Sequence, residues 1–525
     1  MAKVLISDAL SPRAVDIFKE RGIETDMKVG LKPDELKAII GNYDGLAIRS
    51  ATKVTKEILA AAPHLKVIGR AGIGVDNVDV PAATARGVVV MNTPFGNSIT
   101  TAEHAIAMMM ALARQLPSAD RSTQAGKWEK NRFMGVEISG KTLGLIGAGN
   151  IGSIVADRAL GLKMKVVAYD PFLAPERAQA MGVEKVDLDT LLARADFITL
   201  HTPMTEQTKN LLDAKALAKT KKGVRIVNCA RGGLIVEEDL KAALDSGQVA
   251  GAALDVFLTE PAKENPLFGR DDVICTPHLG ASTNEAQENV ALQVAEQMSD
   301  FLLTGAVTNA VNMPSVSAED APKLKPYMQL ATNLGSYLGQ LQDENVVSVA
   351  IEYEGAVAAL NTKPLTACVL AGFLGAQLET VNSVSAPAVA RERGIAVTET
   401  RHDRASDYPT LISVTVVSQG QTRKIAGSLF GNAKPRIVAI ADVPIEAEFS
   451  ASMLYVRNQD KPGFIGSIGR LFGDSSLNIA SFNLGRQTRG GEAICLIAVD
   501  QPIGEALLEK IRALPQVLRA RALRF

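Results

Sequence analysis

The sequence has little of what marks several common classes of protein. Cysteine occurs 4 times in 525 residues and never as Cys-x-x-Cys, so neither a disulfide scaffold nor a zinc site is expected. The 56 Lys and Arg residues nearly balance the 57 Asp and Glu residues, which argues against a nucleic-acid or membrane-surface protein. No apolar stretch approaches the length that crosses a bilayer. We therefore expect a cytoplasmic protein with reduced thiols, no metal, and no membrane or nucleic-acid partner.

The chain has ample length and apolar content. At 525 residues, 47% of them hydrophobic, it can bury large cores and should form three or four domains. It begins with Met-Ala-Lys-Val-Leu-Ile, which runs directly into an expected strand and does not have the pattern of a signal peptide.

A glycine-rich motif organises the chain. The apolar run 142–146 ends in Gly147-Ala-Gly149-Asn-Ile-Gly152, and an Ala-rich amphipathic stretch follows. The three glycines suit a tight turn, a close approach of backbone to a pyrophosphate, and close packing of a helix on a strand. The helix N-terminus offers N–H groups to phosphates. Asp170 ends the next apolar run, where a carboxylate accepts ribose hydroxyls and repels a 2′-phosphate, so the motif predicts NAD rather than NADP.

The remaining pattern predicts an α/β protein of several domains. Residues 1 to about 95 alternate short apolar runs with helical patterns, which indicates a parallel sheet covered by helices. A second such unit contains the glycine motif, and an expected helix over 284–303 returns the chain to the first unit. The last 75 residues scan as βαββαβ, the order of a ferredoxin-like module. The predicted domains are a discontinuous flavodoxin-like substrate domain (1–98 and 285–314), a Rossmann-type nucleotide-binding domain (99–284), a small α+β intervening domain (315–449) and the ferredoxin-like module (450–525).

Basic and polar side chains follow the expected strands of the first unit. Arg49, Arg70 and Asn97 lie at or just after strand ends, with glycine-rich backbone after Arg70. Ligands of open α/β sheets bind at the carboxyl ends of the strands. A surface position would explain each arginine alone, but two arginines at neighbouring strand ends favour an anion-binding site.

A base and its partner can be sought among only five histidines. His278 follows an expected strand, and Glu260 closes a loop shortly before it. A carboxylate bonded to one imidazole nitrogen fixes the tautomer of the ring and keeps it near its useful range. Arg231 follows another strand end, and its planar guanidinium can hold a carboxylate with two bonds. A polar turn or a solvated loop would explain each residue singly, but the three together favour a hydroxy-acid dehydrogenase.

His201 and His104 are competing bases. His201 also follows an expected strand, but no acid stands at comparable spacing, so we interpret it as lining the cofactor cleft. His104 lies inside an expected helix, and His64 and His402 lie in polar segments, which are weaker positions.

These stretches together resemble the D-isomer-specific 2-hydroxyacid dehydrogenases. The resemblance is carried by the glycine motif and by Asn228-Cys-Ala-Arg-Gly-Gly-Leu-Ile, Asp255-Val-Phe-Leu-Thr-Glu-Pro and Thr276-Pro-His-Leu-Gly-Ala. Two further stretches, Arg49-Ser-Ala-Thr-Lys-Val and Gly69-Arg-Ala-Gly-Ile-Gly-Val-Asp-Asn-Val-Asp, resemble the members that act on 3-phosphoglycerate. Phe430-Gly and Pro435-Arg-Ile-Val resemble the intervening domain of their long form, and the C-terminal module resembles an ACT domain.

The resemblance implies NAD-dependent oxidation of 3-phospho-D-glycerate to 3-phosphohydroxypyruvate, the first step of L-serine biosynthesis. The implied catalytic residues are Arg231, Glu260 and His278. The residues implied to contact NAD are Gly147, Gly149, Asn150, Ile151, Gly152, Asp170, Cys229, Ala230, Arg231, Asp255, His278, Leu279, Gly280 and Ala281. Those implied to line the substrate site are Arg49, Ser50, Arg70, Gly72, Asn97, Lys130 and Arg132, the last two from a neighbouring subunit of an oligomer.

The ACT resemblance implies regulation by L-serine. Such modules bind serine between paired copies, and Asn458, Asp460 and Asn478 fall at the positions expected to hold the amino acid. The first is Asn where relatives carry His or Tyr, whereas Asp460 still suits an ammonium group. An ACT module used only for assembly is the alternative, and a homotetramer is the implied assembly.

Two other functions remain open. Another D-2-hydroxyacid oxidoreductase, such as a glyoxylate or hydroxypyruvate reductase, would share the cofactor motif and the base but would need no cations for a phosphate. Arg49 and Arg70 therefore discriminate against it. An NAD-sensing corepressor-type scaffold with little turnover is the third reading, and the C-terminal module argues against it.

Overall fold

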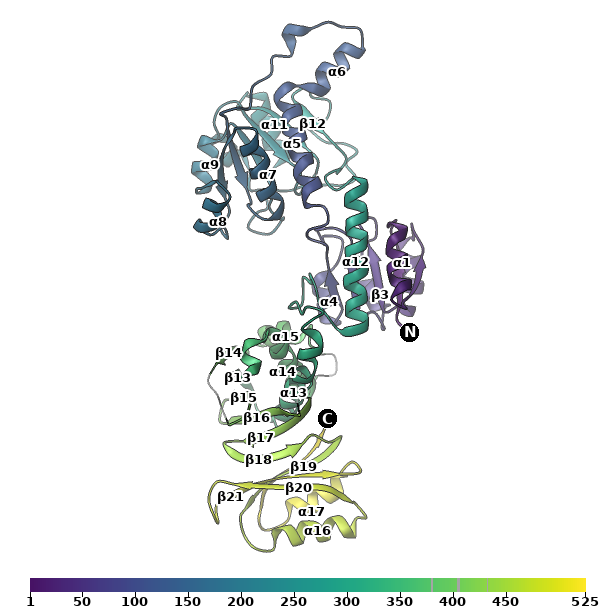
Figure 1. Cartoon of the computed structure of the whole chain (residues 1–525), viewed down its shortest axis with the longest axis vertical. Helices are drawn as coiled ribbons and strands as arrows, with labels where there is room; N and C mark the ends of the chain where they lie inside the picture. The colour runs from purple at the N-terminus through teal and green to yellow at the C-terminus, as the bar shows by residue number, and fades with distance from the viewer. Residues whose placement is uncertain (379–380, 404–406, 432) are drawn as a thin grey trace.

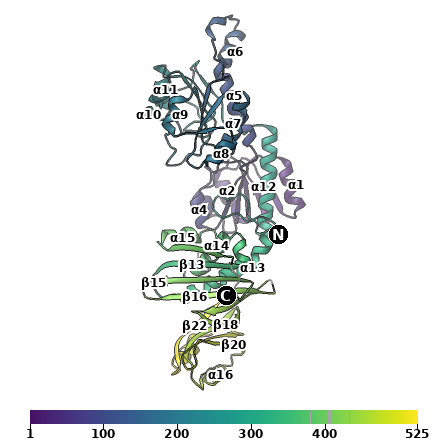
Figure 2. The ribbon, with the colours of Figure 1, turned by 60° about the vertical axis from the view of Figure 1, so that its left-hand side comes forward.

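The computed structural model describes residues 1–378, 381–403, 407–431 and 433–525. The chain forms four units, each built on one sheet, and the units follow one another along the long axis of the molecule (Figures 1 and 2). The second unit, which contains the glycine motif, lies at one end (Figure 1). The first, third and fourth units follow it in that order.

The first unit is a parallel sheet in the order β2-β1-β3-β4-β5, which confirms the predicted flavodoxin-like fold. Alternate residues of a strand face opposite sides of the sheet: Val4 and Ile6 of β1 face one core, and Leu5 faces the other. The elements are β1 (Lys3–Ile6), α1 (Pro12–Glu20), β2 (Glu24–Met27), α2 (Pro33–Ile39), η1 (Ile40–Asn42), β3 (Gly45–Ile48), α3 (Lys56–Ala60), β4 (Val67–Arg70), α4 (Val80–Ala85) and β5 (Val89–Met91).

A long helix, α12 (Asn284–Thr304), returns the chain to the first unit after the second is complete. Figure 1 shows it lying against α1. It packs so closely on β4 that a Cβ at Gly69 would lie 2.2 Å from Sδ of Met298. The chain therefore crosses twice between the first two units.

The second unit is a parallel sheet in the order β12-β11-β10-β9-β6-β7-β8, which confirms the predicted Rossmann-type fold. The strand order reverses at β6, so the glycine motif begins where ligands of such sheets bind. The elements are α5 (Ser98–Arg114), α6 (Leu116–Gln124), η2 (Lys130–Arg132), β6 (Thr142–Ile146), α7 (Asn150–Gly161), β7 (Lys165–Tyr169), α8 (Pro175–Ala180), β8 (Glu184–Lys185), α9 (Leu188–Arg194), β9 (Phe197–Leu200), α10 (Ala214–Ala218), β10 (Val224–Asn228), α11 (Glu237–Asp245), β11 (Val249–Leu254) and β12 (Val273–Cys275).

One predicted helix is divided in the structure. The pattern over 100–116 predicts a single helix, but Gln115 takes a left-handed conformation with φ of 52° and ends α5. Pro117 then suits the first turn of α6, because proline lacks the N–H that a helix start leaves unused. Helix α6 projects from the rest of the second unit (Figure 1).

The third unit is a mixed sheet in the order β14-β13-β15-β16-β17-β18, with two helices that cross without side chains between them. A Cβ at Gly335 of α13 would lie 2.0 Å from the Val369 carbonyl oxygen of α14, so glycine is required for this approach. The elements are α13 (Ala321–Gln340), β13 (Val346–Gly355), η3 (Ala356–Ala359), α14 (Lys363–Gly375), α15 (Ala386–Glu392), β14 (Ala396–His402), β15 (Thr410–Ser418), β16 (Thr422–Phe430), β17 (Lys434–Ile440) and β18 (Val443–Glu448).

The fourth unit confirms the predicted βαββαβ order, with an antiparallel sheet β20-β21-β19-β22. One face packs on its two helices. The other face, including Tyr455 and Leu496, joins the core of the third unit. Its elements are β19 (Ser452–Gln459), α16 (Phe464–Asp474), β20 (Ile479–Arg486), β21 (Glu492–Val499), α17 (Glu505–Arg512) and β22 (Val517–Arg524). In the described part of the chain, every helix is too short or too polar to cross a membrane.

The close crossing of α13 and α14 gives a stability prediction. We expect Gly335→Ala to destabilise the third unit by roughly 1–3 kcal/mol, because the new methyl group overpacks the crossing. Gly466→Ala is the matched control, since no heavy atom would lie within 4 Å of its Cβ and alanine favours a helix by about 1 kcal/mol. Calorimetric melting of the two variants tests this. A Gly335→Ala protein that melts at or above the wild-type temperature would contradict the close-packing account.

Candidate active site

The glycine motif leaves main-chain groups open at the end of β6. Gly147 has φ of 93°, and a Cβ there would lie 2.5 Å from the His201 carbonyl oxygen. A Cβ at Gly152 would lie 2.1 Å from the Gly147 carbonyl oxygen. At Gly149, the N-cap of α7, an added Cβ would have no heavy atom within 4 Å. The free side of Gly149 and the helix N-terminus fit the phosphates of a dinucleotide.

Asp170 lies at the end of β7, beside the motif. Its carboxylate accepts hydrogen bonds from the N–H of Ala148 at 2.8 Å and of Phe172 at 2.8 Å. It also lines a cavity of about 570 Å³ together with Tyr169, Lys185, Arg194 and neighbouring residues. Asn150 is exposed and Ile151 is half-buried at the start of α7. The residues predicted to hold the cofactor phosphates and ribose therefore lie together at the carboxyl ends of β6 and β7.

A buried carboxylate organises the loop that carries His278. Asp255, fully buried at the end of β11, accepts hydrogen bonds from the N–H of Leu279 at 2.7 Å and of Gly280 at 2.8 Å. It also accepts one from the Thr276 hydroxyl at 2.6 Å. Burial opposes ionisation of Asp255, but the bonds from His104, Thr276 and Leu279 outweigh it and lower the pKa of the carboxyl.

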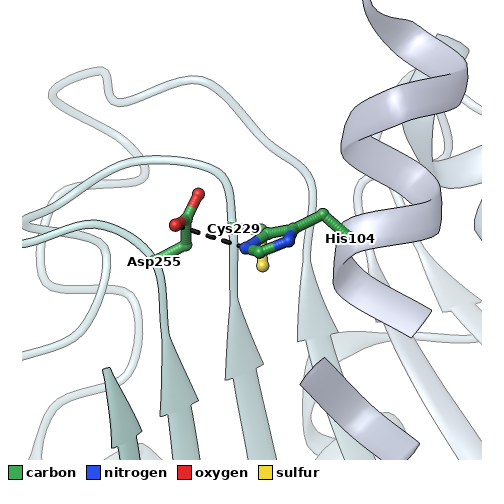
Figure 3. Close-up of side chains that lie close together, drawn as sticks. All are labelled: His104, Cys229 and Asp255. Atoms are coloured by element: carbon green, nitrogen blue, oxygen red, sulfur yellow. Dashed lines mark ion pairs between the residues drawn. The ribbon is translucent and has the colours of Figure 1, made fainter. Parts of the chain in front are cut away.

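His104 faces this carboxylate from helix α5. Its Nε2 lies 3.3 Å from Oδ1 of Asp255, and Figure 3 shows the ring turned toward Asp255 with the sulfur of Cys229 close to it. Histidine, cysteine and aspartate at this spacing, within 4.8 Å of one another, are also potential metal ligands. Both carboxylate oxygens of Asp255, however, already accept hydrogen bonds from within the protein. Burial and the charge of Asp255 raise the pKa of the Cys229 thiol well above its usual range, which disfavours the thiolate that a metal needs.

His278 and Glu260 form a hydrogen-bonded pair. Nδ1 of His278 lies 2.7 Å from Oε2 of Glu260, and Oε1 of Glu260 accepts the N–H of Phe257 at 3.0 Å. With its Nδ1 proton donated to Glu260, the ring presents the Nε2 lone pair as a proton acceptor. His278 has φ of 57°, a conformation that costs free energy for a non-glycine residue. The hydrogen bonds that the next two N–H groups donate to Asp255 hold it there.

The pH range of this pair follows from Glu260. Its burial raises the pKa, but the bonds from His278 and from the Phe257 N–H lower the pKa below the ordinary value of 4.5. A carboxyl group whose pKa is lowered in the folded state stabilises that state at pH values above its ordinary pKa. This contribution is lost as the pH falls through the lowered pKa. The pair is therefore retained at neutral pH and is lost only in acid.

Three arginines lie near one another where the first two units meet. Arg70 follows β4, and burial together with the nearby Arg231 and Arg49 lowers its pKa to about 10. Its Nε is buried without a hydrogen-bond partner. Its guanidinium also covers Gly72, where a Cβ would lie 1.5 Å from Nη1. Such mutual proximity of like charges is the arrangement expected for an anion site.

The remaining predicted substrate residues divide into two groups. Asn97 caps α5 at the junction of the two units, is 7% exposed and has an unpartnered Oδ1; Ser50 is exposed beside Arg49. Lys130 and Arg132 lie instead on the exposed turn η2. Arg132 pairs there with Glu129 and Asp271 of the second unit. Within one chain, the structure does not bring Lys130 and Arg132 to the other arginines.

Of the predicted regulatory residues, Asn458 and Asp460 lie at the C-terminal end of β19, whereas Asn478 lies at the opposite end of the fourth sheet. Within one chain, the structure therefore does not bring Asn478 to the other two. Asn458 is 1% exposed with an unpartnered Oδ1. Asp460 accepts hydrogen bonds from Arg486 and from the Gly490 N–H. Asn478 donates to Asp500 at 2.8 Å. Arg486 of the same chain thus occupies the carboxylate that was predicted to meet an ammonium group.

The sequence reasoning missed three partners of these residues. Asp76 bonds to Arg231, Asp8 bonds to the Arg49 N–H, and His104 approaches Asp255. Asp8 and Asp76 follow β1 and β4, so their positions at strand ends were a usable signal. His104 had no signal of this kind, because a helix interior does not show which strand end it faces.

Comparison with known proteins extends these observations. Three family models match the chain: the NAD binding domain of D-isomer specific 2-hydroxyacid dehydrogenases over residues 106–280, the D-3-phosphoglycerate dehydrogenase intervening domain over 323–441, and the ACT domain over 452–516. The first match contains the glycine motif, Asp170, Arg231, Glu260 and His278.

The chain is similar over nearly its full length to several enzymes called D-3-phosphoglycerate dehydrogenase. It is 46% identical to that of Synechocystis sp., covering 97% of this chain and 92% of the relative. It is 43% identical to that of Bacillus subtilis, covering 99% and 98%. Among solved structures, a glyoxylate reductase from Paecilomyes thermophila shares 29% identity with a TM-score of 0.55, covering 59% of this chain and 98% of that one. A D-lactate dehydrogenase from Aquifex aeolicus complexed with NAD and lactic acid shares 26% identity with a TM-score of 0.53, covering 59% and 100%.

The His278–Glu260 pair gives a prediction for turnover. We expect His278→Ala to lower kcat by roughly 10²–10⁴-fold, the usual contribution of a general base. Binding of NADH, followed by its fluorescence, should be retained because the glycine motif is untouched. His64→Ala, which removes an exposed imidazole from the first unit, is the control and should turn over normally. Normal turnover by His278→Ala would refute the assignment of the base.

Proposed function

The chain belongs to the D-3-phosphoglycerate dehydrogenase family, and we propose how its residues divide the work of that family's reaction. The protein is an NAD-dependent oxidoreductase that converts 3-phospho-D-glycerate to 3-phosphohydroxypyruvate, the first step of L-serine biosynthesis. The observation that carries the division of roles is the His278–Glu260 pair at 2.7 Å, beside three electrostatically coupled arginines.

The second unit holds the cofactor. The open side of Gly149 and the N-terminus of α7 fit the pyrophosphate, and Asp170 accepts the ribose hydroxyls beside its cavity. A carboxylate at that position repels a 2′-phosphate, which favours NAD over NADP. The nicotinamide side of the cofactor meets the loops after the later strands, namely Cys229, Ala230, Arg231, Asp255 and His278 to Ala281. When bound, NAD supplies the acceptor for the hydride that leaves C2 of the substrate.

The arginines bind the two anionic ends of the substrate. Arg231 binds the C1 carboxylate with the N–H groups of 71–74, and Arg49 and Arg70 bind the phosphate. Because burial and two nearby guanidinium groups disfavour the charge of Arg70, a bound dianion relieves the repulsion among the three arginines. Ser50, Gly72 and Asn97 complete the wall of the site.

His278 takes the hydroxyl proton. Its Nε2 accepts the proton from O2 of the substrate as the C2 hydride leaves, and Glu260 stabilises the imidazolium that results. The Nδ1–Glu260 bond sets the tautomer. His201 does not compete for this role, because burial lowers its pKa to about 4 and Thr199 contacts its Nε2 at 2.9 Å.

The last unit serves regulation and assembly. The match to an ACT domain supports an amino-acid site, and we assign L-serine to a site between paired copies of this unit. Asn458 and Asp460 come from one copy and Asn478 from the other, and the ammonium group of serine has to displace Arg486 from Asp460. The proposed assembly is the homotetramer implied by the family, in which Lys130 and Arg132 reach the phosphate in a neighbouring subunit.

The proposed domain division is 1–98 with 285–314, 99–284, 315–449 and 450–525. Four free cysteines accord with a reducing cytoplasm.

Substrate selectivity tests this assignment. We expect NADH formation with 3-phospho-D-glycerate to far exceed that with unphosphorylated D-glycerate, because only the former uses Arg49 and Arg70. Arg49→Ala should raise KM for 3-phospho-D-glycerate by about 10- to 100-fold, the range of a charge-assisted hydrogen bond, and should leave the slow reaction of glycerate unchanged.

The control for this experiment is Arg86→Ala, an exposed arginine at the opposite edge of the first sheet. It should not alter either substrate. Equal catalytic efficiency with the two substrates would overturn the phosphate assignment and would favour a glyoxylate or hydroxypyruvate reductase.

A further inference from the structure

The Arg231 guanidinium is held by residues of both the first and the second unit. It follows β10 of the second unit, yet its Nε donates to Oδ2 of Asp76, in the loop after β4 of the first unit, at 2.9 Å. Its Nη1 donates to the Ala230 carbonyl oxygen at 2.7 Å. Among the described residues, this is the one ion pair found between the first two units.

The third nitrogen of the guanidinium, Nη2, lies against the main chain of the loop after β4. A Cβ added at Gly74 would lie 1.8 Å from Nη2 of Arg231 and 2.8 Å from Oδ2 of Asp76. Glycine at 74 therefore admits the guanidinium against the main chain of 71–74. Two nitrogens are engaged by Asp76 and Ala230, so Nη2 is the one that remains to bind a carboxylate oxygen.

The charges around Arg70 explain why Arg231 needs a carboxylate as its partner. Arg231 and Arg49 both act on Arg70 as repelling charges, and Asp76 and Asp8 oppose them. Asp8 is only 4% exposed, and the Arg49 N–H and Thr52 already use its oxygens. Asp76 is thus the acidic group that both contacts Arg231 and offsets the charge of Arg70. Without Asp76, the charge of Arg70 would repel Arg231 with no carboxylate in contact to hold it.

We propose that Asp76 is a positioning residue for the reaction: from the first unit, it aims Arg231 of the second unit at the substrate carboxylate. The residue does not touch the reacting atoms. It ties the orientation of the arginine that binds C1 to the position of the loop after β4. The proposal rests on the function proposed above for Arg231.

The test compares two aspartates of the same loop. Asp76→Asn removes the charge and keeps the shape. It should lower kcat with 3-phospho-D-glycerate by about 10- to 100-fold, the range of one charge-assisted hydrogen bond, with a smaller change in KM, since Arg49 and Arg70 still bind the phosphate. The affinity for NADH should not change. Asp76→Glu should restore part of the loss.

The matched control is Asp79→Asn. Asp79 lies three positions further on and caps α4 through the Ala82 N–H at 2.9 Å, so the charge change is the same but Arg231 is not contacted. Its kinetics should equal those of the wild type.

Each outcome decides the proposal. Wild-type kcat and KM in Asp76→Asn, a loss confined to KM, or an equal loss in Asp79→Asn would overturn it. So would a parallel loss of NADH affinity, which indicates damage to the fold. These results differ from failure of the proposed function, in which the wild-type protein itself does not oxidise 3-phospho-D-glycerate.

Discussion

Repulsion among three guanidinium groups is the constraint on which the site depends. Arg49, Arg70 and Arg231 come from three different strand ends, and the last belongs to another unit. Folding brings them together at a cost that burial of Arg70 increases, because its charged form loses hydration. Asp8 and Asp76 offset part of that cost. In the proposed function, a substrate with a carboxylate at one end and a phosphate at the other offsets the rest, so the same positive charge selects the substrate.

The orientation of His278 depends on a second charge, the buried carboxylate of Asp255. Asp255 has no contact with solvent, and its oxygens accept the N–H groups of the two residues after His278. That anchor maintains the left-handed conformation of His278 and so directs its ring toward Glu260. His104 closes the arrangement from α5, the helix that starts at the junction of the two units (Figure 3). The proposed base, His278, is therefore oriented by the loop and by Glu260 together.

The sequence alone predicts those parts of the site whose partners are close along the chain. The glycine motif and Asp170 lie in one βαβ unit, and Glu260 and His278 flank one strand, so spacing suffices. Asp76 and Arg231 are 155 positions apart, and their pairing exists only once two sheets face each other. The pairing of Arg486 with Asp460 was missed because a side-chain contact between strands leaves no periodic signal. The break at Gln115 was missed because the left-handed conformation of a single residue leaves none either. The α/β fold and the βαββαβ module were predicted because their periodicity is local.

The central claim is that the arginines hold 3-phospho-D-glycerate with C2 toward the nicotinamide position and its hydroxyl toward His278. The direct measurement is turnover of 3-phospho-D-glycerate carrying deuterium at C2, followed by mass spectrometry of the reduced cofactor. We expect the deuterium in the NADH that forms. Unlabelled NADH, with deuterium released to water, would contradict it.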